Sequence, residues 1–166
     1  MKSRPLPPRK HTPTGIGKRE RNRRLTSLGL SRHDDEEIQE QALAIVERFR
    51  AWTGQQPCVL TGWRTGEIHE FEGRPWKVVV QWAHVVATRG NWAPDFGITI
   101  PLCDLLHRRQ ENDPTFFTPH SLDASQFARA HAVRYFAVRP QDADWIVEHA
   151  QDDYAIALAI AGLETR

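Results

Sequence analysis

The sequence has few of the features that hold a secreted protein together or anchor a protein in a membrane. Its 166 residues include only two cysteines, too few for the disulfide framework of a small secreted scaffold. No apolar run approaches the roughly 18 residues that a membrane-spanning helix needs. The basic N-terminus leads into proline, glycine and charged residues, so a secretory signal is not expected either. We therefore expect a cytoplasmic protein without a membrane partner.

A low net charge conceals two oppositely charged parts of the chain. The formal net charge is +1, with 22 Lys and Arg against 21 Asp and Glu. Residues 1–33 contain ten of those basic side chains and a single acid, Glu20, for a charge of +9, whereas the remainder carries −8. With 40% hydrophobic residues, the chain suits one compact domain with a tail and not a wholly disordered protein.

The composition of residues 1–33 predicts a flexible basic arm. They include several prolines and glycines and almost no apolar periodicity, so ordering them would cost more conformational entropy than their burial offsets. Basic arms of this kind bind nucleic acid, because each Lys or Arg that neutralises a phosphate releases a condensed counterion. The alternative is a tail that only solubilises the protein. The candidate phosphate-binding residues of the arm are Arg19, Arg21, Arg23 and Arg24.

The rest of the chain alternates between helical and strand patterns, which predicts an α+β fold. Apolar residues recur at three- and four-residue steps from Asp34 to Trp52, after acids that suit a helix N-terminus, so residues 34–54 form a first helix. A middle region covers 55–138, and a C-terminal helix within 139–166 packs on the same domain. The other expected elements are a short strand that leads into a turn over 57–62, a strand over 74–86, a helix over 101–111 with Pro101 in its first turn, and helices over 123–138 and 141–162.

The residues suited to catalysis are concentrated in the middle region. His107 and Glu111 are four apart on the expected helix and therefore project from one face, where they could hold a cation together. His84 ends the preceding apolar strand and could face that cation. A strand histidine acting as a base beside a helix-bound metal is a compact arrangement for hydrolysing a phosphodiester. Taken singly, each of these residues is more often a packed or solvated side chain.

The run from Ala83 to Glu111, AHVVATRGNWAPDFGITIPLCDLLHRRQE, resembles the HNH, or ββα-metal, nuclease motif of phage-encoded proteins. Upstream, PCVLTG (57–62) resembles the Cys-x-x-Cys-Gly knuckle that often precedes this motif, and FFTPHSLDASQFARAHA (116–132) resembles the segment that closes such domains. The resemblance implies a ββα-metal core flanked by helices, within the middle region 55–138. It also implies an intracellular, phage- or bacterium-encoded endonuclease that cuts DNA with a divalent ion, Mg²⁺ in the first place, with Zn²⁺ or Mn²⁺ as alternatives.

The resemblance assigns a role to individual residues of the motif. It implies that His84 is the general base, that His107 and Glu111 are metal ligands, and that Asp95 supports the loop or the metal. Glu111 stands where the family usually has a second histidine, and a carboxylate there suits a hard cation such as Mg²⁺. The arginines expected to contact nucleic acid in this region are Arg89 and Arg108.

The expected zinc knuckle departs from the family pattern. Thr61 and Leu106 stand where two of the four zinc ligands would be, and the remaining Cys58 and Cys103 cannot alone fill a tetrahedral site. We therefore expect no structural zinc, with apolar packing around Trp63 and Leu106 in its place. Two other interpretations stay open. The chain could be a catalytically degenerate HNH-fold protein that binds nucleic acid, or a small phage interaction or packaging accessory protein.

Overall fold

The computed structural model describes residues 17–85, 96–113, 115–117 and 123–165. Within these ranges the protein has a mixed α+β fold with six helices and two small antiparallel sheets. The helices are α1 (Lys18–Thr26), α2 (Glu36–Gln55), α3 (Asp104–Asn112), α4 (Ala124–Val138), α5 (Pro140–His149) and α6 (Asp153–Glu164). The strands are β1 (Ile68–Phe71), β2 (Arg74–Lys77), β3 (Val80–His84) and β4 (Thr99–Cys103).

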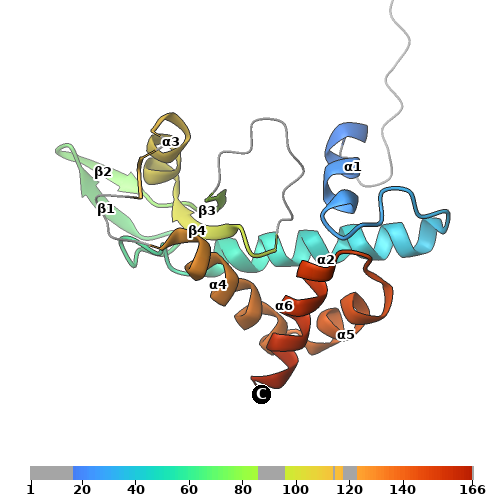
Figure 1. Ribbon diagram of the computed structural model, residues 1–166. Coiled ribbons are helices and arrows are strands. Elements are labelled where there is room, and N and C mark those ends of the chain that lie inside the picture. The colour runs from blue at the N-terminus through green and yellow to red at the C-terminus, as the bar shows by residue number, and fades with distance from the viewer. Residues whose placement is uncertain (1–16, 86–95, 114, 118–122, 166) are drawn as a thin grey trace, which may run out of the picture.

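The long helix α2 is the centre of the arrangement. Helices α4, α5 and α6 lie on one side of it, α1 and α3 stand on the other side, and the strands lie near its C-terminal end (Figure 1). Its N-terminus is capped by Asp35, whose carboxylate accepts hydrogen bonds from the backbone of Glu37 and Ile38 at 2.9 and 3.3 Å. The helix predicted over 34–54 is therefore confirmed, with its boundaries shifted by one or two residues.

Helix α1 corrects the prediction of a flexible arm that reaches residue 33. Leu25, Leu28 and Leu30 are at most 1% exposed and belong to the same hydrophobic cluster as the apolar face of α2. Burying one leucine stabilises a fold by about 1.5–3 kcal/mol, so three of them offset much of the entropy of ordering this short segment. The prediction is wrong for residues 18–30, and residues 1–16 lie outside the described part of the chain.

The strands form two separate antiparallel hairpins. The first, β1–β2, is largely exposed. The second pairs β3 with β4, from Val80 opposite Cys103 to His84 opposite Thr99. The single strand expected over 74–86 is divided between the two hairpins, and 57–62 forms a turn in place of a strand, with the Gly62 amide donating to the Cys58 carbonyl at 2.8 Å.

Pro101 lies in strand β4 and not in the first turn of a helix, as had been expected. A proline is tolerated here because a two-stranded sheet leaves the outer edge of each strand without a ladder partner. Its carbonyl accepts a hydrogen bond from the Val59 amide at 3.0 Å. Helix α3 therefore begins at Asp104, three residues later than predicted, directly after the strand.

The helices of the C-terminal half are packed against α2 by a buried polar cluster and by aromatic rings. Asp142 on α5 is 2% exposed and accepts hydrogen bonds from the Tyr135 hydroxyl at 2.5 Å and from Arg48 of α2 at 2.6 Å. Helix α4 is confirmed with its cap at Asp123. The single helix predicted over 141–162 is divided into α5 and α6, because the Asp152 side chain caps a new helix.

A fully buried phenylalanine connects the β3–β4 hairpin to the helical core. Phe96 precedes β4, and its ring centroid lies 4.7 Å from that of Phe49 on α2. Gly97, next to it, has a φ of +78°, and a Cβ at this position would lie 2.6 Å from the Tyr154 ring. Only glycine fits this approach, so the start of β4 is held at a defined distance from α6.

Candidate active site

The unit β3–β4–α3 brings together three of the residues singled out in the sequence. His84 is the last residue of β3, and α3 follows β4 without a connecting loop. The Gln110 side chain of α3 donates a hydrogen bond to the His84 carbonyl at 3.0 Å. This bond ties the end of β3 to the helix that carries His107 and Glu111, so the strand histidine and the helix pair lie in the same part of the molecule.

His107 is oriented by a residue that the sequence analysis did not identify. Its Nδ1 lies 2.8 Å from the Oε1 atom of Gln81 on β3. An amide oxygen only accepts hydrogen bonds, so Nδ1 carries the proton and Nε2 keeps a lone pair. That Nε2 atom lies 3.6 Å from Glu111 Oε1. The expectation that His107 and Glu111 share one helix face is confirmed; that they hold a cation together stays a prediction.

The environment of His107 favours its neutral form. Burial lowers the pKa of His107 below its ordinary value, Glu111 raises it in part, and the nearby His84 imidazole lowers it again. An imidazole must be neutral to bind a metal, so the lowered pKa keeps His107 available as a ligand at neutral pH.

Two of the predicted residues lie outside the described part of the chain, and the residues that are described contain no complete metal cage. Asp95 and Arg89 lie outside the described residues. Among the residues that are described, no three His, Cys, Asp or Glu side chains are arranged to hold a metal ion. His107 and Glu111 remain as a two-residue donor set, which is enough for Mg²⁺ where waters and a substrate phosphate complete the coordination.

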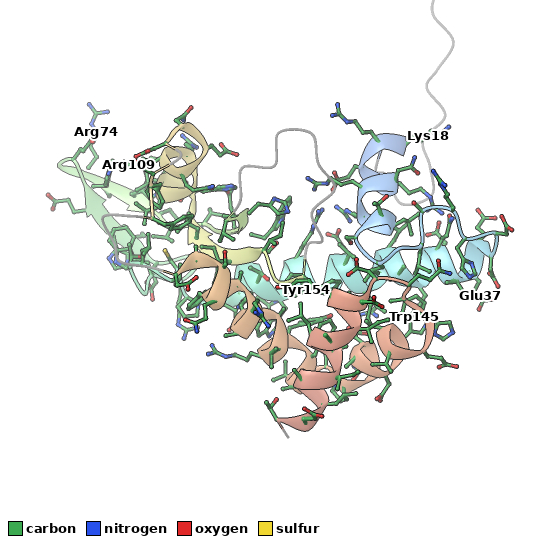
Figure 2. The ribbon with its side chains drawn as sticks, in the orientation of Figure 1. Lys18, Glu37, Arg74, Arg109, Trp145 and Tyr154 are labelled. Atoms are coloured by element: carbon green, nitrogen blue, oxygen red, sulfur yellow. The ribbon has the colours of Figure 1, made fainter. Side chains whose placement is uncertain are left out.

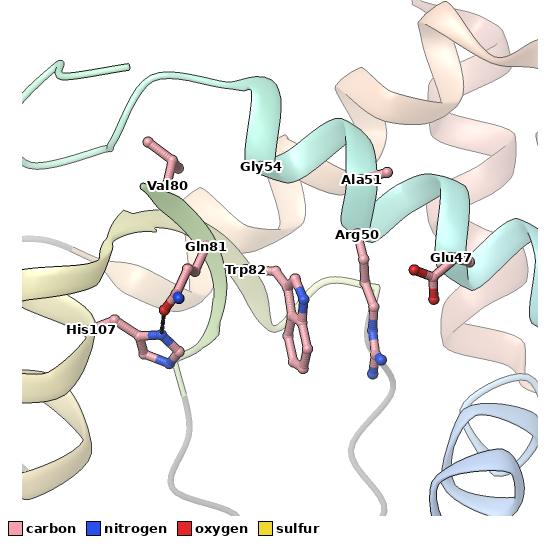
Figure 3. A pocket seen from close by; sticks show the side chains of 8 residues that line it. All are labelled: Glu47, Arg50, Ala51, Gly54, Val80, Gln81, Trp82 and His107. Carbon is pink, nitrogen blue, oxygen red and sulfur yellow. Dashed lines mark hydrogen bonds between the residues drawn. The ribbon is translucent and has the colours of Figure 1, made fainter. Parts of the chain in front are cut away.

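A cavity of about 440 Å³ lies beside His107, between α2, β3 and α3. Figure 3 shows Trp82 between Arg50 on one side and Gln81 with His107 on the other, all four side chains extending toward the same opening. The Arg50 guanidinium carbon lies 4.1 Å from the centroid of the Trp82 ring. Sequence analysis did not identify this pair, because the two residues are 32 positions apart and no local motif connects them.

The two cysteines meet in the second hydrophobic cluster of the protein, as the resemblance to a zinc knuckle implied. Both are buried, and their side chains are hydrogen-bonded to each other, which lowers the pKa of Cys58 and raises that of Cys103. Trp63 and Leu106 pack against this cluster. In the described part of the chain no further His, Cys, Asp or Glu completes a zinc site here.

The arginines predicted to bind phosphate differ in their surroundings. Arg19 and Arg108 are exposed. In contrast, Arg24 is only 10% exposed and pairs with Glu20 and with Glu47 of α2, so the structure gives it a role in holding α1 against α2. Arg21 and Arg23 also pair with carboxylates, those of Glu40 and Glu20. Sequence analysis could not identify these pairs, because most of the acids lie on another helix.

Comparison with known proteins adds no relative to these observations. No protein-family model, no curated protein and no solved structure matches the chain. The resemblance to HNH nucleases therefore remains a prediction from the motif, and the geometry of His84, His107 and Glu111 is the basis for a functional proposal.

Proposed function

We propose that the protein is a divalent-metal-dependent phosphodiesterase of the HNH type that acts on DNA. The observation that supports this most strongly is the placement of His107: Gln81 directs its Nε2 toward Glu111, and its lowered pKa keeps the ring neutral beside His84. Metal-binding histidines commonly donate their other ring N–H to an oxygen acceptor, which fixes the tautomer. The strand–strand–helix order of β3, β4 and α3 also agrees with a ββα-metal core.

Each residue of the proposed site has one task. His107 and Glu111 hold the divalent ion, which when bound neutralises charge on the scissile phosphate and on the leaving oxygen. His84 accepts the proton of the attacking water. The mixed nitrogen and carboxylate donors fit Mg²⁺ or Mn²⁺ and are also compatible with Zn²⁺. Asp95 retains its predicted supporting role.

The distribution of basic residues supports a nucleic-acid substrate. Lys18 at the tip of α1, Arg109 on α3 and Arg74 at the end of the β1–β2 hairpin project on the same side of α2 (Figure 2). Exposed Arg19 and Arg108 belong to the same two helices, α1 and α3. Residues 1–16 add further positive charge immediately before α1. Cations on one side of a molecule attract the phosphate backbone of DNA at long range.

A second candidate function is binding of nucleic acid without cleavage. It is favoured by the finding that no three metal-binding side chains come together among the described residues. In that case His107 and Glu111 bind no metal ion, and the basic side chains on α1 and α3 carry the function.

A cleavage assay separates the two candidates. Supercoiled plasmid and single-stranded DNA are incubated with the protein and Mg²⁺ or Mn²⁺. We expect nicking that stops in EDTA and that falls by about 10²–10⁴-fold in His84→Ala, the range typical of a lost general base. His149→Ala is the matched control, since His149 lies on α5 outside the site and is also partly exposed. Equal nicking by His84→Ala and the parent would remove His84 from the mechanism, and absence of nicking with retained DNA binding would establish the second candidate.

A further inference from the structure

The cavity beside His107 has a composition that neither metal binding nor phosphate contact requires. Its wall contains an indole ring from Trp82, an amide from Gln81, a carboxylate from Glu47 and a guanidinium from Arg50. Phosphates are bound by cations and by N–H and O–H donors, and not by carboxylates or aromatic faces. Flat aromatic surfaces next to amide and carboxylate groups are instead the surroundings in which proteins hold a nucleobase.

The Trp82 ring is held rigidly, which suits it for stacking. Arg50 is 3% exposed, and its Nη1 donates to Glu20 Oε1 at 2.8 Å while its guanidinium covers the indole at 4.1 Å. Trp82 also contacts His84 edge-on, with ring centroids 5.3 Å apart. A platform that is already ordered loses little conformational entropy when a ligand binds to it.

The polar groups of the cavity complement the hydrogen-bonding edge of a base. The Oε1 atom of Gln81 accepts from His107, whereas its Nε2 amino group donates to no other side chain in the described part of the protein. The Glu47 side chain is 64% exposed at the rim, where its carboxylate can accept from an exocyclic amino group. The cavity volume of about 440 Å³ lies within the range of small-ligand pockets.

We propose that this cavity binds one unpaired nucleobase by stacking on Trp82, and that the DNA recognised by the protein is therefore single-stranded next to the reacting phosphate. The inference rests on the proposed function, from which it takes nucleic acid as the ligand. What it adds is that this nucleic acid is single-stranded at the site. A base within a duplex is covered on both faces by its neighbours and must leave the stack to reach the indole, which costs a few kcal/mol. A base in a single strand avoids most of that cost.

Equilibrium binding in EDTA tests the proposal without any catalysis. Fluorescence anisotropy compares a labelled single-stranded oligodeoxynucleotide with the same sequence as a duplex, at one salt concentration. We expect the single strand to bind at least about tenfold more tightly, and Trp82→Leu to weaken its binding by about 5- to 100-fold, the effect of losing one stacked base. Duplex binding by Trp82→Leu should stay unchanged. The control Trp145→Leu replaces a tryptophan on α5 outside the cavity and should leave both affinities as they are.

A change in the ligand provides a test that does not depend on the folding of a variant. The parent protein is titrated with a single strand in which abasic sites replace the bases while all phosphates remain. We expect a loss of affinity of about fivefold or more. Equal affinity for the abasic and normal strands, or equal affinity for single strand and duplex, would overturn the proposal. If single strands bind more tightly but no DNA is nicked, the base-binding proposal stands and the proposed hydrolysis fails. If duplex DNA is nicked, and equally well by Trp82→Leu, the hydrolysis stands and the base-binding proposal fails.

Discussion

Protonation of a buried histidine should make the stability of this protein sensitive to mild acid. His131 on α4 is 3% exposed and lies among the rings of Trp52 and Phe127. Its Nε2 lies 3.0 Å from the Thr53 hydroxyl, which itself donates to the Phe49 carbonyl, so the Nε2 of His131 is the donor in this pair. Burial and, to a smaller extent, repulsion from Arg134 together lower the pKa of His131 to about 3.

The magnitude follows from the difference between the folded and unfolded pKa values. The unfolded chain protonates His131 near its ordinary pKa of 6.5, whereas the folded protein does not protonate it until the pH approaches 3. The stabilisation is therefore fully present above pH 6.5 and is lost progressively as the pH falls from 6.5 toward 3. By linkage, the free energy of unfolding falls by about 1.3 kcal/mol between pH 7 and pH 5.5 through this residue alone.

Urea unfolding at these two pH values measures the effect. The parent is compared with His131→Phe, which keeps an aromatic ring in an aromatic site but cannot be protonated. The other titrating groups contribute equally to both proteins. Between pH 7 and pH 5.5 the free energy of unfolding of the parent should therefore fall by about 1.3 kcal/mol more than that of the variant. His149→Gln, at a histidine that is 26% exposed, should lose as much stability as the parent. The reasoning is refuted if His131→Phe shows the same loss between the two pH values as the parent.

Two further predictions concern the proposed function. Gln81→Leu removes the acceptor that fixes the His107 tautomer, so Mn²⁺ affinity measured by calorimetry should fall by about 10- to 100-fold; an unchanged affinity means that Gln81 does not orient the ligand. Deletion of residues 1–16 removes basic side chains that precede α1 in the sequence, so the slope of log affinity for DNA against log salt should become shallower by about one unit for each lost phosphate contact. An unchanged slope would place the DNA-binding surface elsewhere.

Local signals in the sequence were sufficient for some elements of the fold. Asp35 and Asp123 each stand directly before a helical pattern, and both cap the helices that were predicted there. The four-residue spacing of His107 and Glu111 likewise sufficed to place them on one face. Caps and helical spacing act within one turn of the chain, so a single sequence contains the information needed.

Elements whose stability depends on distant partners could not be predicted in this way. Helix α1 is a basic segment by composition. It is ordered because its arginines form ion pairs with acids on α2 and because leucines at its C-terminal end and just after it pack in a hydrophobic cluster shared with α2. The stacking of Arg50 on Trp82 and the hydrogen bond from His107 to Gln81 join residues on different elements. Such contacts are set by tertiary packing and leave no pattern in the local sequence.

The central claim is that His107 and Glu111 hold one divalent ion, with His84 beside it as the general base. Paramagnetic broadening by Mn²⁺ tests it most directly, because the effect falls steeply with distance from the ion. The imidazole proton signals of His107 and His84 should broaden at substoichiometric Mn²⁺, while those of His149 on α5 stay sharp, and Glu111→Gln should weaken the effect. Equal broadening of all three histidines, or none at His107, would contradict the account.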